Sequence, residues 1–195
     1  MTKFKLHTPE TAPESSKEIL AASLKQNGFI PNLYGIMAES PELLKAYRNL
    51  SDSFNATSLS QIEKNIVWLA VSNYNACHYC MAIHTSVAKM HQLPADMIEA
   101  LRDNVPLKNE KLETLRKFAV LLTEKRGWAN EEEISKFLEA GYTLKNILEL
   151  VLGIGQKIIS NYVNHITQTS VDKQVEEFIW EAQTEACNCK MEKKL

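Results

Sequence analysis

Apolar residues recur along the chain at the three- and four-residue spacing of amphipathic helices, and no segment alternates apolar and polar residues as a strand would. No glycine or proline lies between Pro41 and Pro94, which is typical of long helices joined by short connections. The pattern predicts helices over residues 14–26, 41–54, 60–74, 77–90, 94–101, 110–125, from 130, 143–167 and 170–182. The sequence therefore predicts one all-α domain over residues 1–182, of which 1–28 form an N-terminal arm and first helix. We expect residues 183–195 to be a charged, mobile tail.

Local signals support several of these boundaries. Ser40 and Asn130 are residue types that cap helix starts, and Pro41 tolerates the first helical position. The long apolar segment 143–167 contains Gly153 and Gly155, which predict close approach of another helix.

Charge and composition exclude several classes of function. The chain has 195 residues, with 24 acidic and 22 basic side chains and a net charge of −2. This near balance argues against a general affinity for nucleic acid or for an acidic membrane surface. No apolar run is long enough to span a membrane, and the N-terminus lacks the apolar core of a signal peptide. We therefore expect a cytoplasmic protein.

The four cysteines form two close pairs, Cys77 with Cys80 and Cys187 with Cys189. Close pairs in a reducing compartment indicate reversible redox chemistry or a metal site. Cys77, Cys80 and His84 stand at i, i+3 and i+7 and share one face of a helix. The two sulfurs can therefore form a disulfide with little backbone movement. The helix start favours a thiolate at Cys77, and His84 lies one turn from Cys80, where it can exchange a proton with that sulfur.

Two other interpretations of this cluster stay open. A zinc ion could use the same three residues, but a fourth ligand is missing, because His78 and His91 project away from that face. Alternatively, the cysteines and the histidine pack in a helical core without chemistry. Of these, we favour the redox pair, with no cofactor and no metal.

Several segments together resemble a known family. Leu69-Ala-Val-Ser72 is followed by Asn75-Ala-Cys77-His-Tyr79-Cys80 and by His84. Phe29–Asn32, Ser40–Leu44 and Leu152–His165 extend the likeness over most of the chain. This pattern is similar to the alkylhydroperoxidase D-like branch of the carboxymuconolactone decarboxylase superfamily, in its peroxidase-related members.

The resemblance implies an all-α bundle in which the CxxC motif opens a central helix lining a cleft, with subunits assembled as trimers or hexamers. It implies reduction of small hydroperoxides without a cofactor: Cys80 attacks, Cys77 resolves the product as a disulfide, and His84 relays protons. A dithiol reductant or a peroxiredoxin would be the partner.

Two positions depart from the family pattern. Well-characterised members carry a glutamate twelve residues before the first cysteine, where this chain has Asn65, and a second histidine where it has Tyr79. We therefore treat Asn65 and Tyr79 as possible relay or cleft residues, together with Asn164 and His165 of the polar cluster near residue 164. For Cys187 and Cys189 the family offers no counterpart, and we expect them to be bystanders.

Alternative functions follow from the same features. The protein could act mainly as a disulfide reductase for a peroxiredoxin, using the same two sulfurs. It could be a carboxymuconolactone decarboxylase-type enzyme, although such members generally do not rely on a CxxC motif. It could also be a non-catalytic oligomeric protein that keeps the motif for structure.

Overall fold

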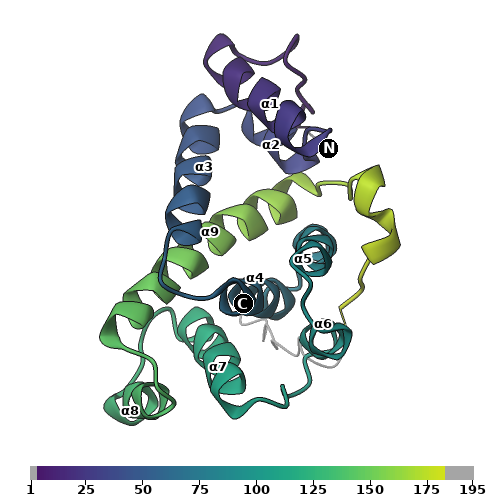
Figure 1. The fold of residues 1–195 in the computed structure, drawn as a ribbon. Helices are drawn as coiled ribbons and strands as arrows, with labels where there is room; N and C mark the ends of the chain where they lie inside the picture. The colour runs from purple at the N-terminus through teal and green to yellow at the C-terminus, as the bar shows by residue number, and fades with distance from the viewer. Residues whose placement is uncertain (1–3, 183–195) are drawn as a thin grey trace, which may run out of the picture.

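The computed structural model describes residues 4–182, which form nine α-helices and one 3₁₀ helix and contain no strand (Figure 1). The all-α fold class predicted from the sequence is confirmed. The elements are α1 (Glu14–Asn27), α2 (Asn32–Met37), α3 (Pro41–Asn55), α4 (Gln61–Tyr74), α5 (His78–Met90), α6 (Ala95–Arg102), α7 (Glu110–Glu124), α8 (Glu131–Glu139), α9 (Leu144–Thr167) and η1 (Lys173–Phe178).

Most helices begin and end within one or two residues of the predicted bounds, because their starts are set by local caps. Ser60 and Glu63 form a reciprocal capping box at α4, Asn130 and Glu133 form one at α8, and Ser40 caps α3. These bonds satisfy amide groups that the first helical turn leaves without partners.

The structure differs from the prediction at two places. The predicted helix over 170–182 is only the short 3₁₀ helix η1, in which Val175 is buried and no long apolar face exists to stabilise an α-helix. The six-residue helix α2 was not predicted, because it is too short to show a helical period.

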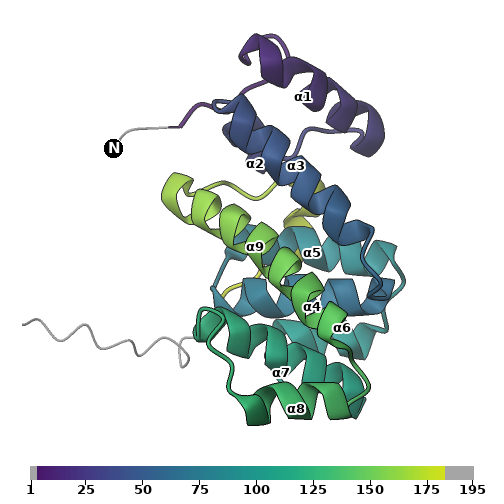
Figure 2. The same ribbon diagram turned by 90° about the vertical axis from the view of Figure 1, so that its left-hand side faces the viewer.

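Helix α4 forms the centre of the molecule and packs against α5, α7 and α9. A second apolar cluster joins the N-terminal helices to α5, and it includes Leu20, Leu33, Leu44, Cys77 and Cys80. Figure 2 shows α1, α2 and α3 at one end of the molecule and α9 crossing its front, where no other described element covers it. The cysteine pair therefore lies where the N-terminal helices close over α5.

Close approach of α3 and α9 depends on one glycine. A Cβ atom on Gly153 would lie 2.5 Å from the ring of Phe54, whereas a Cβ on Gly155 would meet nothing within 4 Å. The predicted close helix contact is therefore confirmed at Gly153. For Gly155 it is wrong within the described chain, because this residue faces outward.

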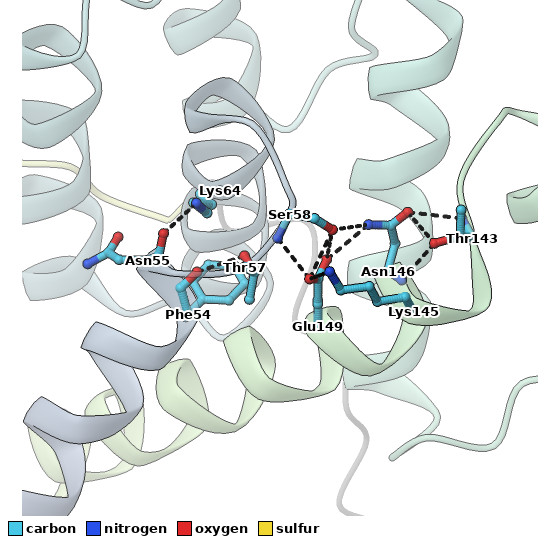
Figure 3. Close-up of polar contacts among 9 residues, drawn as sticks. All are labelled: Phe54, Asn55, Thr57, Ser58, Lys64, Thr143, Lys145, Asn146 and Glu149. Atoms are coloured by element: carbon cyan, nitrogen blue, oxygen red, sulfur yellow. Dashed lines mark hydrogen bonds and ion pairs between the residues drawn. The ribbon is translucent and has the colours of Figure 1, made fainter.

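The start of α9 is fastened to the loop before α4 (Figure 3). The backbone N–H of Ser58 donates to Oε1 of Glu149 over 2.8 Å, and the Ser58 hydroxyl donates to Oε2 over 2.7 Å. The amide of Asn146 also donates to Oε2, over 2.9 Å. These charge-assisted bonds fix α9 relative to α4, and so they set the distance between α9 and α5 across the site described below.

The predicted tail 183–195, with Cys187 and Cys189, lies outside the described residues. Within residues 4–182, no helix combines the length and the apolar character needed to cross a membrane.

Candidate functional site

The CxxC motif sits at a sharp turn between α4 and α5. Ala76 adopts φ 50°, in the left-handed region, and Cys77 follows as the N-cap of α5. The N–H of Cys77 donates to the carbonyl of Ser72 over 2.9 Å, which holds the turn in place. Cys77 and Cys80 are both free thiols and both buried. The turn therefore directs the two sulfurs into the protein, toward α9.

Two amide groups of α9 converge on the sulfur of Cys80. Nδ2 of Asn161 lies 3.1 Å from Sγ of Cys80, and Nδ2 of Asn164 lies 3.3 Å from it. Asn164 also lies 3.9 Å from Sγ of Cys77. Oδ1 of Asn161 accepts a 2.8 Å bond from Asn75, which orients the amide so that its hydrogens face the sulfur. A sulfur that accepts two amide hydrogens is favoured as a thiolate.

Electrostatics separate the two thiols. Burial alone would raise the pKa of Cys80, but hydrogen bonding from Cys77, the charge of Lys157, and bonds from Ser160 and Asn164 together hold that pKa well below its ordinary value. The hydrogen bond to Cys80 and then burial raise the pKa of Cys77. The expectation that the helix start favours a thiolate at Cys77 is therefore wrong: the buried contacts from α9 outweigh the helix terminus.

His84 forms no hydrogen bond with the sulfur of Cys80. Its Nε2 lies 2.8 Å from Nζ of Lys157, its ring stacks on Trp68 with 5.1 Å between centroids, and its Nδ1 is buried without a hydrogen-bond partner. Burial, then the charge of Lys157 and then His91, hold the pKa of His84 well below its ordinary value. The direct proton exchange expected from helical spacing is not seen, because the ring turns toward α9.

Lys157 was missed by the sequence analysis. It is fully buried and belongs to a polar stripe on one face of α9, formed by Gln156, Lys157, Ser160, Asn161 and Asn164. This spacing of i, i+1, i+4, i+5 and i+8 inside an otherwise apolar helix was the available signal. Polar residues facing inward from a long apolar helix indicate a site.

Tyr79, the second of the two departures from the family pattern, joins three segments beside the sulfurs. Its hydroxyl donates to Oδ2 of Asp172 over 2.7 Å and accepts from the N–H of Leu33 over 3.2 Å. Oδ1 of Asp172 accepts from the N–H of Asn32 over 2.8 Å. Tyr79 therefore fastens α2 and the segment before η1 to α5, and burial raises its pKa well above the ordinary value.

Of the other predicted candidates, only one lies against the sulfurs. Asn65 is buried in α4 and its Nδ2 lies 3.0 Å from Nδ1 of His91, not against His84. Asn164 lies against both sulfurs, but the side chain of His165 is exposed. The residue that approaches the sulfurs from this cluster is therefore Asn164.

A cavity of about 720 Å³ leads to Cys80. Its aromatic walls are Phe29, Tyr34, Tyr47, Trp68 and Tyr79, and its polar lining includes Arg48, His84, Gln156 and Lys157. Cys80 lines the cavity, whereas Cys77 does not. A small molecule entering it would thus meet Cys80 first.

Within residues 4–182, no group of three or more His, Cys, Asp or Glu side chains is arranged to hold a metal ion. His78, considered above as a fourth zinc ligand, has its Nδ1 2.8 Å from the carbonyl oxygen of Trp180.

Comparison with known proteins agrees with the family resemblance. Residues 41–120 match the model of the Carboxymuconolactone decarboxylase family. The search of curated proteins found no match. Among solved structures, the chain is similar to a peroxidase-related protein with an alkylhydroperoxidase AhpD core from Ralstonia eutropha JMP134 (TM-score 0.80, 15% identity, covering 90% of this chain and 96% of that one).

Two further solved structures share the fold. A peroxidase-related protein from Silicibacter sp. TM1040 gives a TM-score of 0.77 at 18% identity, covering 89% of this chain and 92% of that one. The debrominase Bmp8, in a cysteine-to-alanine variant bound to 2,3,4-tribromopyrrole, gives 0.72 at 15% identity, covering 91% and 96%. At these identities the likeness shows a shared fold.

Proposed function

We propose that this chain is a thiol oxidoreductase of the alkylhydroperoxidase D-like branch and that it reduces small organic hydroperoxides. The observation that supports this most is the pair of amide donors, from Asn161 and Asn164, on the cavity-lining sulfur of Cys80. Such donors stabilise the thiolate, which is the nucleophilic form of cysteine.

The reaction uses the two sulfurs in order. The Cys80 thiolate attacks the terminal oxygen of the hydroperoxide, so the O–O bond breaks and the alkoxide that leaves takes up a proton. Cys80 is then a sulfenic acid, oxidised by two electrons. The Cys77 thiol attacks that sulfur, water leaves, and a Cys77–Cys80 disulfide results. The amide of Asn164 contacts both sulfurs, and this supports the order because it places Cys77 beside Cys80.

Return to the dithiol requires an external reductant. We assign this step to a dithiol of the cytoplasm, which enters through the same cavity and attacks Cys80, because Cys77 does not line it. A role as a disulfide reductase for a peroxiredoxin would use the same step with a protein disulfide as the oxidant.

We further assign the outer face of α9 to a contact with a second copy of the chain.

A second candidate is reductive dehalogenation. The aromatic walls of the cavity favour a planar ring, and a debrominase shares the fold. In such a reaction the dithiol supplies two electrons: the carbon–bromine bond breaks, carbon gains hydrogen, bromide leaves, and the disulfide forms. Because both candidates end in the same disulfide, the oxidant distinguishes them.

The test is a single-turnover experiment on the reduced full chain with cumene hydroperoxide and, separately, with a brominated pyrrole. Peptide mass spectrometry should show a Cys77–Cys80 disulfide with the hydroperoxide. Cys77→Ser should stop at a sulfenic acid that dimedone traps, and a variant with serine at 187 and 189 serves as the matched control with normal turnover. The proposal fails if Cys80→Ser consumes hydroperoxide as fast as the parent.

A disulfide formed only with the bromopyrrole would favour the dehalogenase instead. Ordinary reactivity of both thiols, with neither oxidant consumed, would favour a structural CxxC motif. Conversion of a lactone by the Cys80→Ser variant would favour decarboxylase-type chemistry.

A further inference from the structure

Lys157 is a buried lysine without a carboxylate partner. Its side chain is fully buried, its Nζ lies 2.8 Å from Nε2 of His84, and the ion pairs formed among residues 4–182 do not include it. An ammonium group removed from water is strongly destabilising unless an anion compensates its charge. Lys157 therefore either has an anion nearby or loses its proton.

The groups that face Lys157 leave one anion to consider. Helix α5 contributes Cys80 and His84, with Cys77 at its N-cap, and α3 contributes the buried phenol of Tyr47. Burial raises the pKa of Tyr47, so this phenol stays neutral. Helix α4 contributes the indole of Trp68, and His91 follows α5. None of these is a carboxylate.

The buried carboxylates of Asp172 and Glu149 are engaged elsewhere. Asp172 accepts bonds from Tyr79 and Asn32, and Glu149 accepts from Ser58 two turns earlier on α9. The thiolate of Cys80 is the remaining anion, and the charge of Lys157 acts on it. The sulfur and the ammonium therefore form a buried pair of opposite charges, and Ser160 and Asn161, one turn after Lys157 on α9, contact the sulfur.

We propose that Lys157 is the counter-ion and the proton store of Cys80: it is an ammonium while Cys80 is a thiolate, and it releases a proton through His84 when Cys80 is oxidised. The inference rests on the proposed function and extends it. Because Lys157 acts through His84 and through its charge, it is a positioning residue and not a group that contacts the hydroperoxide.

The contact with His84 fixes the direction of transfer. An ammonium can only donate, so Nε2 of His84 accepts and its Nδ1 carries the hydrogen. Nδ1 is buried without a partner, and His84 lines the cavity. The Nδ1–H is thus available to the leaving alkoxide, and the imidazole recovers a proton at Nε2 from Lys157.

The charges balance at each stage. Before the reaction the site holds a Cys77 thiol, a Cys80 thiolate and an ammonium. Attack gives the sulfenic acid and an alkoxide, the alkoxide receives the Nδ1 proton, and Lys157 transfers one to Nε2. The Cys77 thiol then condenses with the sulfenic acid and releases water. The products are the disulfide, an alcohol, water and a neutral amine, so no buried charge is left without a partner.

Proton counting on the parent protein tests this directly. The reduced chain is mixed with one equivalent of cumene hydroperoxide in weakly buffered solution at neutral pH, with an indicator dye. The proposal predicts no net proton uptake during disulfide formation, because Lys157 supplies the proton. Uptake of about one proton per disulfide, with Cys80 starting as a thiolate, would overturn it.

Variants separate the charge from the proton. Lys157→Arg keeps a positive charge, but the guanidinium does not release a proton. Cys80 should therefore stay a thiolate, and about one proton per disulfide should come from solvent. Lys157→Met removes the charge, so the alkylation rate of Cys80 at neutral pH should fall by about tenfold or more and recover at high pH. A merely structural defect would not recover with pH.

The matched control is Lys64→Met. Lys64 is also buried, but its ammonium donates to the carbonyl of Asn55 over 2.7 Å, away from the sulfurs (Figure 3). Its alkylation profile should match that of the parent. The proposal is wrong if Lys157→Met shows the parent's profile as well.

Two measurements keep this inference separate from the peroxidase proposal. Alkylation needs no hydroperoxide, and the proton count can be repeated with diamide, which oxidises dithiols directly. If hydroperoxide is not reduced but diamide oxidation proceeds without proton uptake, the peroxidase proposal fails and the role of Lys157 stands. If hydroperoxide is reduced with uptake of about one proton, the peroxidase proposal stands and the role of Lys157 fails.

Discussion

Asn161 of α9 donates an amide hydrogen to the sulfur of Cys80 in α5 over 3.1 Å, while its carbonyl oxygen accepts from Asn75 over 2.8 Å. The amide is therefore held from both sides, and its dipole is fixed with the positive end at the sulfur. A donor that is already in place loses little conformational entropy when the thiolate forms, which favours ionisation of Cys80.

Asn161→Asp should reverse this effect with almost no change in shape. The carboxylate would place a negative charge beside Sγ, so the thiolate should be destabilised and the alkylation rate of Cys80 at neutral pH should fall by about tenfold. The pH profile of alkylation, followed by mass spectrometry, measures the change. His165→Gln, on the exposed side of the same helix, is the control and should react like the parent. Equal profiles for all three proteins would contradict the prediction.

His84 should make the protein less stable in mild acid. Its pKa in the folded state lies well below the ordinary value, so below about pH 6.5 the unfolded chain binds more protons than the folded one. The free energy of unfolding should therefore fall as the pH drops through that region. His84→Gln should reduce this slope in urea unfolding measured at several pH values.

His91 provides a graded comparison for that experiment. Its pKa is also lowered by burial, but its side chain is more exposed than that of His84. His91→Gln should therefore reduce the slope less than His84→Gln does. An unchanged slope in His84→Gln, or a larger effect at His91, would be inconsistent with a buried neutral imidazole at residue 84.

Gly153→Ala should destabilise the fold despite the better helix propensity of alanine. The new methyl group would lie 2.5 Å from the ring of Phe54, so α3 and α9 must move apart, at a cost of about 1–3 kcal/mol. Urea unfolding measures this loss. In the Phe54→Leu background the added methyl should cost less, because the shorter side chain leaves room. Additive effects of the two substitutions would argue against the contact.

The outer face of α9 should contact a second copy of the chain. Leu144, Leu148, Val151, Tyr162 and Ile166 are exposed along it, and Gly155 lies between them. Their spacing of four and three residues continues through Gly155 and resembles the contact face of paired helices. Because Gly155 has no side chain, a helix of the second copy could cross α9 closely there. Substitution of Leu148 and Val151 by Asp should lower the oligomeric state in sedimentation velocity. Lys136→Asp, at an exposed residue of α8, is the control and should leave the oligomeric state unchanged. A monomeric parent protein would contradict the assignment.

Several features of this protein could be predicted from the sequence because they depend on neighbours within a few residues. Caps such as Ser60 and Asn130 set helix starts, and the apolar period set their lengths. The spacing of Cys77 and Cys80 placed both sulfurs on one face, and the family resemblance rested on motifs of the same short range. The all-α fold and the cysteine pair follow from these local rules.

The electrostatics of the pair were decided only by the tertiary structure. Asn161 and Lys157 lie about eighty residues after Cys80, and they face the sulfur because Gly153 and Glu149 set how α9 crosses the helices beside it. That crossing directs His84 toward an ammonium and makes Cys80, not Cys77, the thiol with the lowered pKa. Charges act through space and not along the chain, so the identity of the reactive sulfur is determined by which polar face of α9 is packed against it.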